Sequence, residues 1–277
     1  AIALALQLRL NHLQITYYTL FILIFYGVTQ LIYFYNKKKI VFFIKRISLL
    51  VVAAIIAIGT FFGEIWSILE YSNESIRGKS DLDAGRSGLD KQYAFQYSNG
   101  VFEPLTLFFP HILGGSSQES LDKNSNLGKA LRKNNIATNQ INSQLRRVPT
   151  YWGDQPLTAP YYAGVICIFL MIFGFIILKA HEKNWLIYLL VTSVVLSMGS
   201  NLETINNLFF DYLPGYNKFR SVTFIIIISI FSVVLISCLA IQKFIEDPKK
   251  YKDDIIKSLY ITIGIFSLIF LSYFVLS

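Results

Sequence analysis

Six long apolar runs constrain this chain most strongly, because a membrane-spanning helix needs about 20 mostly apolar residues. The runs cover roughly residues 16–35, 47–69, 160–178, 184–199, 222–242 and 258–277. Hydrophobic residues make up 54% of the chain and charged residues only 15%, whereas soluble domains carry about 25% charge. The sequence therefore predicts an all-α polytopic membrane protein with about six transmembrane helices.

Basic residues are concentrated in three short connections, which hold about half of the 25 Lys and Arg residues. These connections are residues 36–46, 179–183 and 243–257, and each follows an odd-numbered run. By the positive-inside rule we expect them to face the cytoplasm. Both ends of the chain would then face outward. The net charge of +8 is explained by this topology, so no nucleic-acid partner is expected.

The same pattern divides the chain into four parts. Residues 1–15 are expected to form an interfacial helix or the end of a preceding span, and residues 16–69 a transmembrane helix pair. Residues 70–159 are expected to form an extracytoplasmic cap loop. The remaining residues, 160–277, are expected to supply four transmembrane helices with a short outer loop at 200–221.

Composition within the cap loop is uneven. Residues 93–115 are rich in aromatic and apolar side chains, so we expect them to fold against the membrane mouth. Residues 123–147 are polar and rich in Asn and Gln, which favours a mobile insert. Long loops without structure of their own are usually functional or disordered.

Two acids lie near the outer end of the second run. Glu64 lies inside the run, where an ionisable side chain costs about 2.5–3.5 kcal/mol on insertion scales and usually has a function. We expect it to face the helix bundle or a hydrated cavity. The alternative is a snorkelling carboxylate or one paired with Arg. Glu70 follows at the predicted mouth and is a second candidate binding residue.

Metal or disulfide chemistry is not indicated. His12, His111 and His181 are too scattered for a metal site, and Cys167 and Cys238 both lie in apolar runs. No cofactor is therefore expected. His12 remains a candidate binding residue, and its alternative is a polar cap at the membrane interface.

Two outer segments carry further candidates. Trp152 and Asp154 lie in Tyr-Trp-Gly-Asp-Gln before the third run. Trp152 would stack on a ligand or belong to an interfacial aromatic belt, and Asp154 would bind a ligand or shape a turn.

The second segment, residues 211–220, places Asp211, Tyr216, Lys218 and Arg220 around a Pro-Gly turn before the fifth run. Arg makes bidentate contacts to phosphate oxygens and Lys adds a point charge. An extended or turn conformation up to Phe219 would let both cations reach one phosphate. The alternative is anchoring to lipid headgroups.

Several segments together resemble the YfhO-like family of bacterial membrane proteins. They are Gln-Leu-Arg-Leu-Asn-His-Leu-Gln-Ile-Thr-Tyr-Tyr at 7–18, Gly-Leu-Asp-Lys-Gln-Tyr-Ala at 88–94, Phe-Phe-Pro-His-Ile-Leu-Gly-Gly-Ser-Ser at 108–117, Tyr-Trp-Gly-Asp-Gln at 151–155 and Pro-Gly-Tyr-Asn-Lys-Phe-Arg at 214–220. The resemblance runs along most of the chain.

The resemblance implies a fold of the glycosyltransferase C superfamily and a multi-pass protein of the bacterial inner (cytoplasmic) membrane. It also implies transfer of a sugar from a polyprenyl-phosphate donor to an envelope glycan or lipid acceptor on the outer side. The superfamily's usual catalytic acid lies after the first span, a region expected to precede Ala1. The chain would then be an internal piece, and no catalytic residue is assigned within it.

Two classes of function remain open. The first is the glycosyltransferase, in which Lys218 and Arg220 stabilise the leaving phosphate. Outward acids would bind sugar hydroxyls, and aromatic rings would stack on the sugar. The acids are Glu64, Glu70, Asp90, Asp154 and Asp211, and the aromatic residues are Tyr93, Tyr97 and Trp152. The second class is a non-catalytic scaffold or lipid-handling subunit of an envelope protein complex. A transporter is a weaker third hypothesis, because Glu64 is the one charged residue well inside a run.

Overall fold

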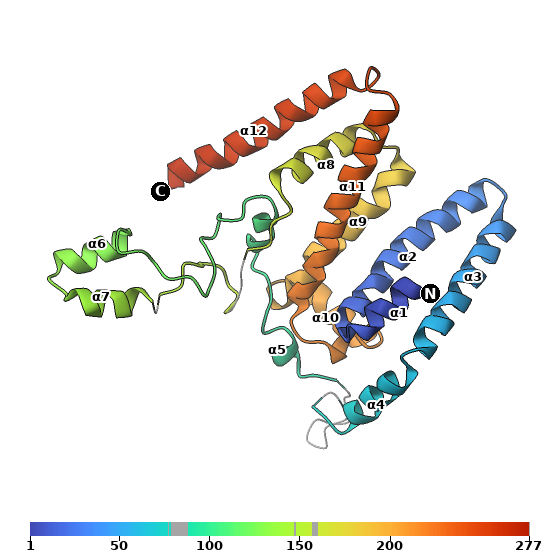
Figure 1. Cartoon of the computed structure of the whole chain (residues 1–277), viewed down its shortest axis with the longest axis horizontal. Helices are drawn as coiled ribbons and strands as arrows, with labels where there is room; N and C mark the ends of the chain where they lie inside the picture. Colours follow the sequence, from blue (N-terminus) through green and yellow to red (C-terminus); the bar gives the residue numbers. More distant parts are fainter. Residues whose placement is uncertain (77, 79–87, 147, 157–159, 277) are drawn as a thin grey trace.

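The computed structural model describes residues 1–76, 78, 88–146, 148–156 and 160–276, and these residues are helical or irregular with no strand (Figure 1). The first four helices are α1 (Ile2–Arg9), α2 (Leu13–Asn36), α3 (Ile40–Gly59) and α4 (Phe62–Asn73). The connecting region holds α5 (Lys91–Ala94), the 3-10 helix η1 (Glu103–Leu107), α6 (Asn126–Lys133) and α7 (Thr138–Leu145). The last part holds α8 (Val165–Ile177), α9 (Ala180–Ser197), η2 (Gly199–Leu202), α10 (Glu203–Tyr212), η3 (Tyr216–Lys218), η4 (Val222–Ile225), α11 (Ile226–Glu246) and α12 (Lys252–Leu276).

Among the residues that the structure describes, four helices are long and apolar enough to cross a membrane, as expected of a multi-pass membrane protein. They are Leu13–Asn36, Ile40–Gly59, Val222–Glu246 and Lys252–Leu271. A fifth span results if α9 is counted together with η2 and α10, although this pair is bent by 111°. The expected third span is reduced to α8, whose 13 residues extend only about 20 Å. The structure therefore supports four or five spans and leaves the sixth as a prediction.

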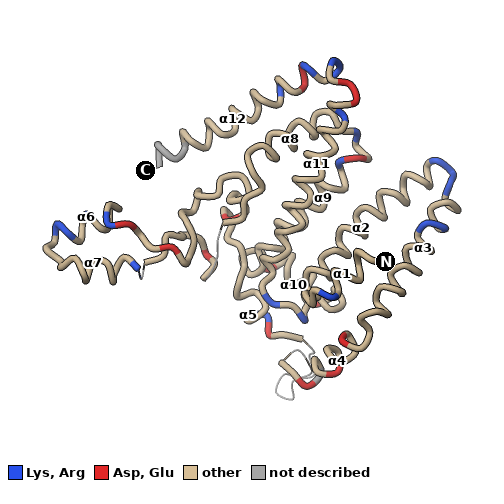
Figure 2. The backbone as a smooth tube through the Cα atoms, in the orientation of Figure 1, with Lys and Arg blue, Asp and Glu red and all other residues tan. Residues whose placement is uncertain are grey.

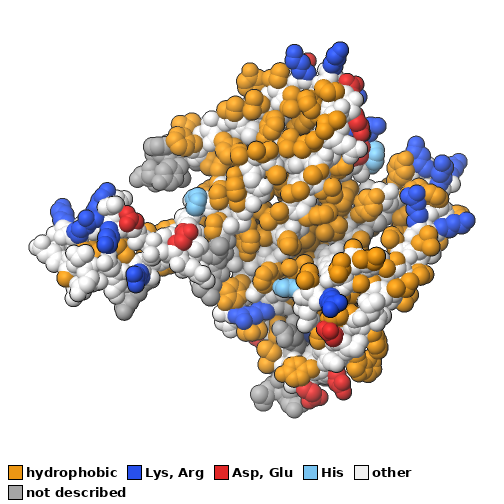
Figure 3. Space-filling model, in the orientation of Figure 1, with side chains coloured by type: hydrophobic (Ala, Val, Ile, Leu, Met, Phe, Trp, Pro, Cys, Tyr) orange, Lys and Arg blue, Asp and Glu red, His pale blue; other side chains and the backbone are white. Residues whose placement is uncertain are grey.

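The helices pack around α11, which contacts both α8 and α9. Helix α2 packs on the other side of α9, α3 contacts α1 and α2, and α12 contacts α8. Half of the α11 span is buried, whereas α2, α3 and α12 are largely exposed. Figure 3 shows the exposed apolar side chains spread over these helices. Such a surface suits contact with acyl chains or with further helices.

Small residues let the central helices approach closely. The hydroxyls of Ser193 on α9 and Ser229 on α11 are hydrogen-bonded at 2.7 Å. Ser237 of α11 donates to the carbonyl oxygen of Cys167 on α8 at 2.8 Å. Gly174 of α8 faces Ile236 of α11 without a side chain between them. Small residues and interhelical hydrogen bonds are typical of helix contacts inside membranes.

Gly174→Ala is expected to destabilise this contact by about 1–3 kcal/mol, because an added methyl group overpacks the interface. Its Cβ would lie 2.6 Å from Cγ2 of Ile236 and 3.2 Å from the Ile236 carbonyl oxygen. Thermal unfolding in detergent micelles measures the change. The control is Gly264→Ala on α12, where a Cβ meets nothing within 4 Å. An equal melting temperature for the two variants would contradict the packing argument.

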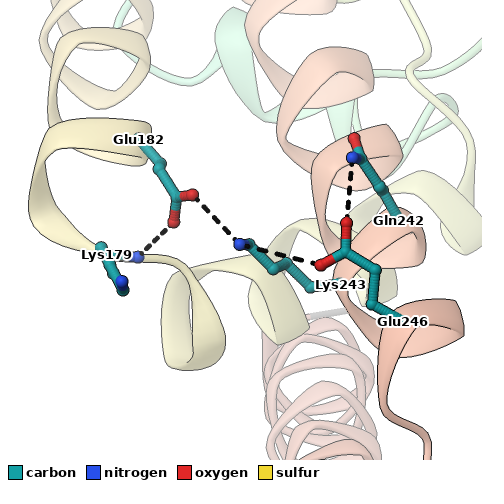
Figure 4. A network of polar contacts seen from close by, with 5 residues as sticks. All are labelled: Lys179, Glu182, Gln242, Lys243 and Glu246. Carbon is teal, nitrogen blue, oxygen red and sulfur yellow. Dashed lines mark hydrogen bonds and ion pairs between the residues drawn. The ribbon is translucent and has the colours of Figure 1, made fainter.

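A polar network ties α9 to α11 at one end of the bundle (Figure 4). Glu182 accepts from the backbone N–H of Lys179 at 2.9 Å and lies 3.4 Å from Nζ of Lys243. Glu246 lies 3.9 Å from the same Nζ and accepts from Gln242 at 3.1 Å. The α2–α3, α8–α9 and α11–α12 connections lie toward this end, away from α4, α5 and α10 (Figure 2). This arrangement supports the expected grouping of the three basic loops.

The connection between α4 and α8 has structure of its own. Two isolated antiparallel bridges, Gly114 with Tyr151 and Ser120 with Pro149, join its two arms. Beyond them α6 and α7 form a helical hairpin that projects away from the other helices (Figure 1). Ser125 caps α6 by accepting from the N–H of Gly128 at 3.1 Å. Within the insert at 123–147 that was expected to be mobile, the described residues thus form two short helices, and its mobility stays a prediction.

Candidate functional site

A cavity of about 510 Å³ lies at the predicted outer end of the bundle. The turn between α1 and α2 forms one wall, α4 forms the second, and the loop around η3 forms the third. Its described lining residues are Asn11, His12, Leu13, Gln14, Tyr17, Ile68, Leu69, Tyr71, Ser72, Ser75, Gly215, Lys218 and Phe219. We call it the outer cavity. Apolar walls with a few polar groups are typical of a ligand site.

The backbone of the third wall is set by one left-handed glycine and by contacts with Tyr17. Gly215 has φ +80°, a value that L side chains rarely adopt, and it begins the η3 turn. The hydroxyl of Tyr17 on α2 donates to the carbonyl oxygen of Pro214 at 2.9 Å. The Tyr17 ring also lies 5.2 Å from that of Phe219. These contacts hold the Pro-Gly turn against the start of α2.

Lys218 and His12 supply basic groups to the outer cavity. Partial burial lowers the pKa of the Lys218 ammonium from its ordinary value. His12 is exposed and caps α2, and its Nδ1 accepts from the N–H of Ile15 at 3.4 Å. The His12 ring lies 5.5 Å from that of Phe224. The structure therefore brings together two sequence candidates that are far apart in the chain.

Arg220 does not line the outer cavity. Its guanidinium donates to the hydroxyl of Tyr93 at 3.1 Å and to Oε1 of Gln96 at 2.6 Å. It also lies 4.4 Å from the ring centre of Tyr93 and 5.0 Å from that of Tyr97. Lys218 ends a 3-10 turn, a conformation that the prediction allowed, but the Arg220 guanidinium bonds to Tyr93 and Gln96 instead of entering the cavity. The expected two-cation clamp is thus not formed in this cavity.

Tyr216 is a core residue rather than an exposed ligand contact. Its side chain is only 2% exposed and packs near Tyr17 and Phe209. Its buried hydroxyl has no hydrogen-bond partner among the described residues. Burial raises the pKa of this hydroxyl well above its ordinary value. Tyr216 therefore supports the wall that carries Lys218.

Asp90 and Asp211 have structural partners next to α5. Asp90 caps α5, because its carboxylate accepts from the N–H of Tyr93 at 3.1 Å. Asp211 forms an ion pair with Lys91, with 2.7 Å between Oδ2 and Nζ. Both acids are exposed, but neither lines the outer cavity.

Glu64 lies outside the transmembrane helix that was expected to contain it. Helix α3 ends at Gly59, where Thr60 donates its hydroxyl to the Ala57 carbonyl oxygen at 2.7 Å. Glu64 then lies in the first turn of α4, where a carboxylate suits the helix dipole. It is exposed, so it does not face the helix bundle, and the alternative of a hydrated environment stays a prediction. Glu70 is also exposed, although its neighbours Leu69 and Tyr71 line the outer cavity.

Trp152 and Asp154 lie on the arm that pairs with Gly114. Trp152 is 70% exposed, and its backbone N–H donates to the Leu113 carbonyl oxygen at 2.9 Å. Asp154 is exposed beside Gly100. The structure does not bring either side chain to the outer cavity.

Sequence patterns missed a buried polar cluster around Glu103, whose side chain is only 3% exposed. Its carboxylate accepts from the Gly100 N–H, the Tyr151 hydroxyl and the Gln155 N–H. Burial raises the pKa of the carboxyl, the backbone hydrogen bonds oppose this, and Asp154 adds to it. The one signal in the sequence was an acid within the aromatic segment 93–115.

The Glu103 cluster continues to the bend between α9 and α10. Gln155 donates to Oδ1 of Asn99 at 2.5 Å, and Asn99 donates to the Ser197 hydroxyl at 3.0 Å. Asn201 of η2 donates to the Asn99 carbonyl oxygen at 3.0 Å. The cluster therefore connects the two arms of the outer connection to the end of α9.

Metal ligation is not indicated in the part of the chain that the structure describes. No group of three or more His, Cys, Asp and Glu side chains lies close enough together there to hold an ion. A comparison of the chain with family models, with curated proteins and with solved structures finds no significant match.

Proposed function

We propose that this chain is part of a membrane glycosyltransferase that takes its sugar from a polyprenyl-phosphate donor, with the outer cavity holding the donor's phosphate and first prenyl units. One observation carries the proposal: the Lys218 side chain meets the N-terminus of α2 in a cavity with apolar walls. This combination suits an amphiphile with an anionic head. The proposal includes a multi-pass location in a bacterial inner membrane and an envelope glycan or lipid as acceptor.

The electrostatics of the outer cavity favour an anion. The first N–H groups of a helix have no partner within the helix, and the helix dipole adds a partial positive charge there. Leu13 and Gln14 carry two such N–H groups and both line the cavity. Lys218 adds a full charge whose hydration is already reduced by partial burial. A phosphate at this place would gain charge-assisted hydrogen bonds.

The walls of the outer cavity favour a hydrocarbon chain next to that phosphate. Leu13, Ile68, Leu69 and Phe219 supply apolar surface. Ile68 and Leu69 lie on α4, directly beyond the end of the α3 span. A prenyl chain would thus pass from the cavity toward the hydrophobic part of the membrane.

In the transfer reaction an acceptor hydroxyl attacks the anomeric carbon and the polyprenyl phosphate leaves. Lys218 and the start of α2 would stabilise the charge that develops on the leaving phosphate. A general base must take the acceptor proton. None of the described residues that line the outer cavity is a carboxylate. We therefore assign the general base to none of the described residues that line the outer cavity.

The same observation favours a second candidate function. A cavity that binds a lipid phosphate and offers no carboxylate suits a non-catalytic lipid-handling subunit or scaffold of an envelope complex. Transfer of labelled sugar separates the two functions. Membranes that contain the full-length protein and a polyprenyl-phosphate sugar would give labelled product only if the protein is an enzyme.

Lys218→Ala is expected to weaken binding of farnesyl phosphate, a short polyprenyl phosphate, about tenfold or more, because it removes a charge-assisted contact. Binding to the protein in micelles is measured by native mass spectrometry. Lys218→Arg should retain most of the affinity. The control is Lys133→Ala, an exposed cation of α6 outside the cavity. Farnesol, which lacks the phosphate, should bind wild type and Lys218→Ala equally. Equal farnesyl phosphate affinity in both proteins would contradict the proposal.

A further inference from the structure

A second cavity of about 540 Å³ lies between α5, η2 and α10. Its lining is mostly polar and includes Gln92, Gln96, Ser200, Glu203 and Asn207. We call it the polar cavity. None of the described residues that line it also lines the outer cavity.

Arg220 fixes the orientation of one amide at the edge of the polar cavity. A guanidinium only donates hydrogen bonds, so the Gln96 oxygen must face Arg220. The distance between Nη2 of Arg220 and Oε1 of Gln96 is 2.6 Å. The Gln96 NH2 group therefore keeps both of its donors available.

The other polar side chains of the cavity also have unused hydrogen-bonding capacity. The side chains of Gln92, Glu203 and Asn207 make no hydrogen bond or ion pair within the described residues. Together they offer amide donors, amide acceptors and a carboxylate acceptor. A ligand with several hydroxyl groups matches such a set, because each hydroxyl both donates and accepts.

Charges around the polar cavity balance. The charged residues of the described lining are Lys91, which is paired with Asp211 at 2.7 Å, and Glu203, and the Arg220 guanidinium bonds to Gln96 at its edge. No excess positive charge remains to favour a phosphate, in contrast to the outer cavity. The Phe95 side chain, which is buried, adds an apolar wall on which C–H groups can pack.

We propose that the polar cavity binds a neutral sugar ring. The hydroxyls would bond to Gln92, Gln96, Glu203 and Asn207, and the C–H face would lie toward Phe95. The sugar belongs either to the acceptor glycan or to the lipid-linked donor. This inference deepens the proposed function and rests on it for the biological source of the sugar, although binding itself is independent of the outer cavity.

The test is saturation-transfer NMR on the protein in lauryldimethylamine oxide micelles, a detergent without sugar. The probes are free glucose, galactose, mannose and N-acetylglucosamine, and farnesyl phosphate mannose. Variants Gln92→Ala, Glu203→Gln and the double variant Gln92→Ala/Asn207→Ala change the lining. The control is Gln140→Ala, an exposed amide on α7. Thermal unfolding shows that each variant is folded.

We expect at least one probe sugar to receive saturation from the wild type. The double variant should weaken binding about tenfold, and the two exposed single variants about threefold. Binding of a free sugar identifies an acceptor site, and binding of the lipid-linked sugar alone, weakened by the lining variants, identifies a donor site. Absence of transfer to every probe sugar, or equal transfer in wild type and lining variants, overturns the proposal. Binding of farnesyl phosphate lost in Lys218→Ala would still support the proposed function in that case.

Discussion

Glu103→Ala is expected to lower the melting temperature of the protein in micelles by about 5–10 °C. Removing the carboxylate leaves the Gly100 N–H, the Tyr151 hydroxyl and the Gln155 N–H without their buried acceptor. Each unsatisfied buried donor costs about 1–3 kcal/mol, which gives about 3 kcal/mol or more in total. Thermal unfolding followed by near-UV circular dichroism measures the loss.

The pH dependence of stability provides a separate test of the same carboxyl. Burial raises the folded-state pKa of Glu103, so the folded protein binds the proton more tightly than the unfolded chain. This contribution is fully present below the unfolded pKa of about 4.3 and is lost as the pH rises through the folded value. Glu103→Gln should remove this decline, since an amide does not titrate.

The matched control for both measurements is Glu119→Ala. Glu119 is an exposed acid of the same connection. It accepts two exposed hydrogen bonds, from the Ser116 N–H at 3.1 Å and from the Thr150 hydroxyl at 3.2 Å, so no buried donor loses its acceptor. Its removal should change the melting temperature much less and leave the pH dependence intact. A Glu103→Ala protein as stable as this control would show that the buried cluster does not hold the two arms together.

Arg220→Ala is expected to open the contact between α5 and the loop before η4. Arg220 makes two hydrogen bonds and lies over two tyrosine rings there. Their loss is worth about 2 kcal/mol, which corresponds to roughly 30-fold faster local hydrogen exchange. Hydrogen–deuterium exchange of peptides covering 89–97 and 216–222 measures it. Arg220→Lys should give part of the effect, because an ammonium lacks the planar fork.

The control is Arg132→Ala on α6, whose guanidinium contacts the Lys123 carbonyl oxygen. It should leave exchange at 89–97 unchanged. If Arg220→Lys instead left exchange unchanged and weakened farnesyl phosphate binding, Arg220 would act on the phosphate as the sequence had suggested. The two measurements therefore separate the structural role from the clamp.

Apolar run length predicted the long helices but not their interruptions. The runs at 16–35 and 222–242 correspond to α2 and to η4 with α11. The run at 47–69 is divided between α3 and α4: α3 ends at Gly59, the Thr60 hydroxyl bonds to the Ala57 carbonyl oxygen at the break, and α4 begins at Phe62. Hydropathy does not register such a local side-chain bond. Hydropathy therefore also placed Glu64 inside a membrane span, because it does not detect that the helix ends at Gly59.

The run at 160–178 differs from the structure in another way. Its first residues are irregular, and the Ala163 N–H donates to the Leu107 carbonyl oxygen at 3.0 Å. The partner lies in η1, so this bond competes with extension of α8 toward its N-terminus. The hydrophobic pattern of one segment contains no information about a hydrogen-bond partner that lies far away in the chain. The structure consequently has a short α8 where the sequence predicted a span.

The sequence predicted which residues near the outer end of the bundle could bind a ligand, but not which of them lie together in one cavity. Lys218 and His12 were both candidates, and the fold brings them to one cavity. Arg220 was given the same role, yet its partners Tyr93 and Gln96 lie more than a hundred residues away in the chain. The Glu103 cluster joins residues of three stretches, 99–103, 151–155 and 197–201, that lie far apart in the chain, so no local spacing reveals it.

The hairpin of α6 and α7 has a practical consequence for experiments on this protein. The chain enters it after Ser120 and returns at Pro149, and these two residues face each other in an antiparallel bridge, about 5 Å apart. Because the chain enters and leaves the hairpin at adjacent points, the segment between these points can change in length without moving the two flanking arms. A compact fusion domain with neighbouring termini can therefore replace the hairpin, giving electron microscopy a rigid landmark for aligning images of a small membrane protein.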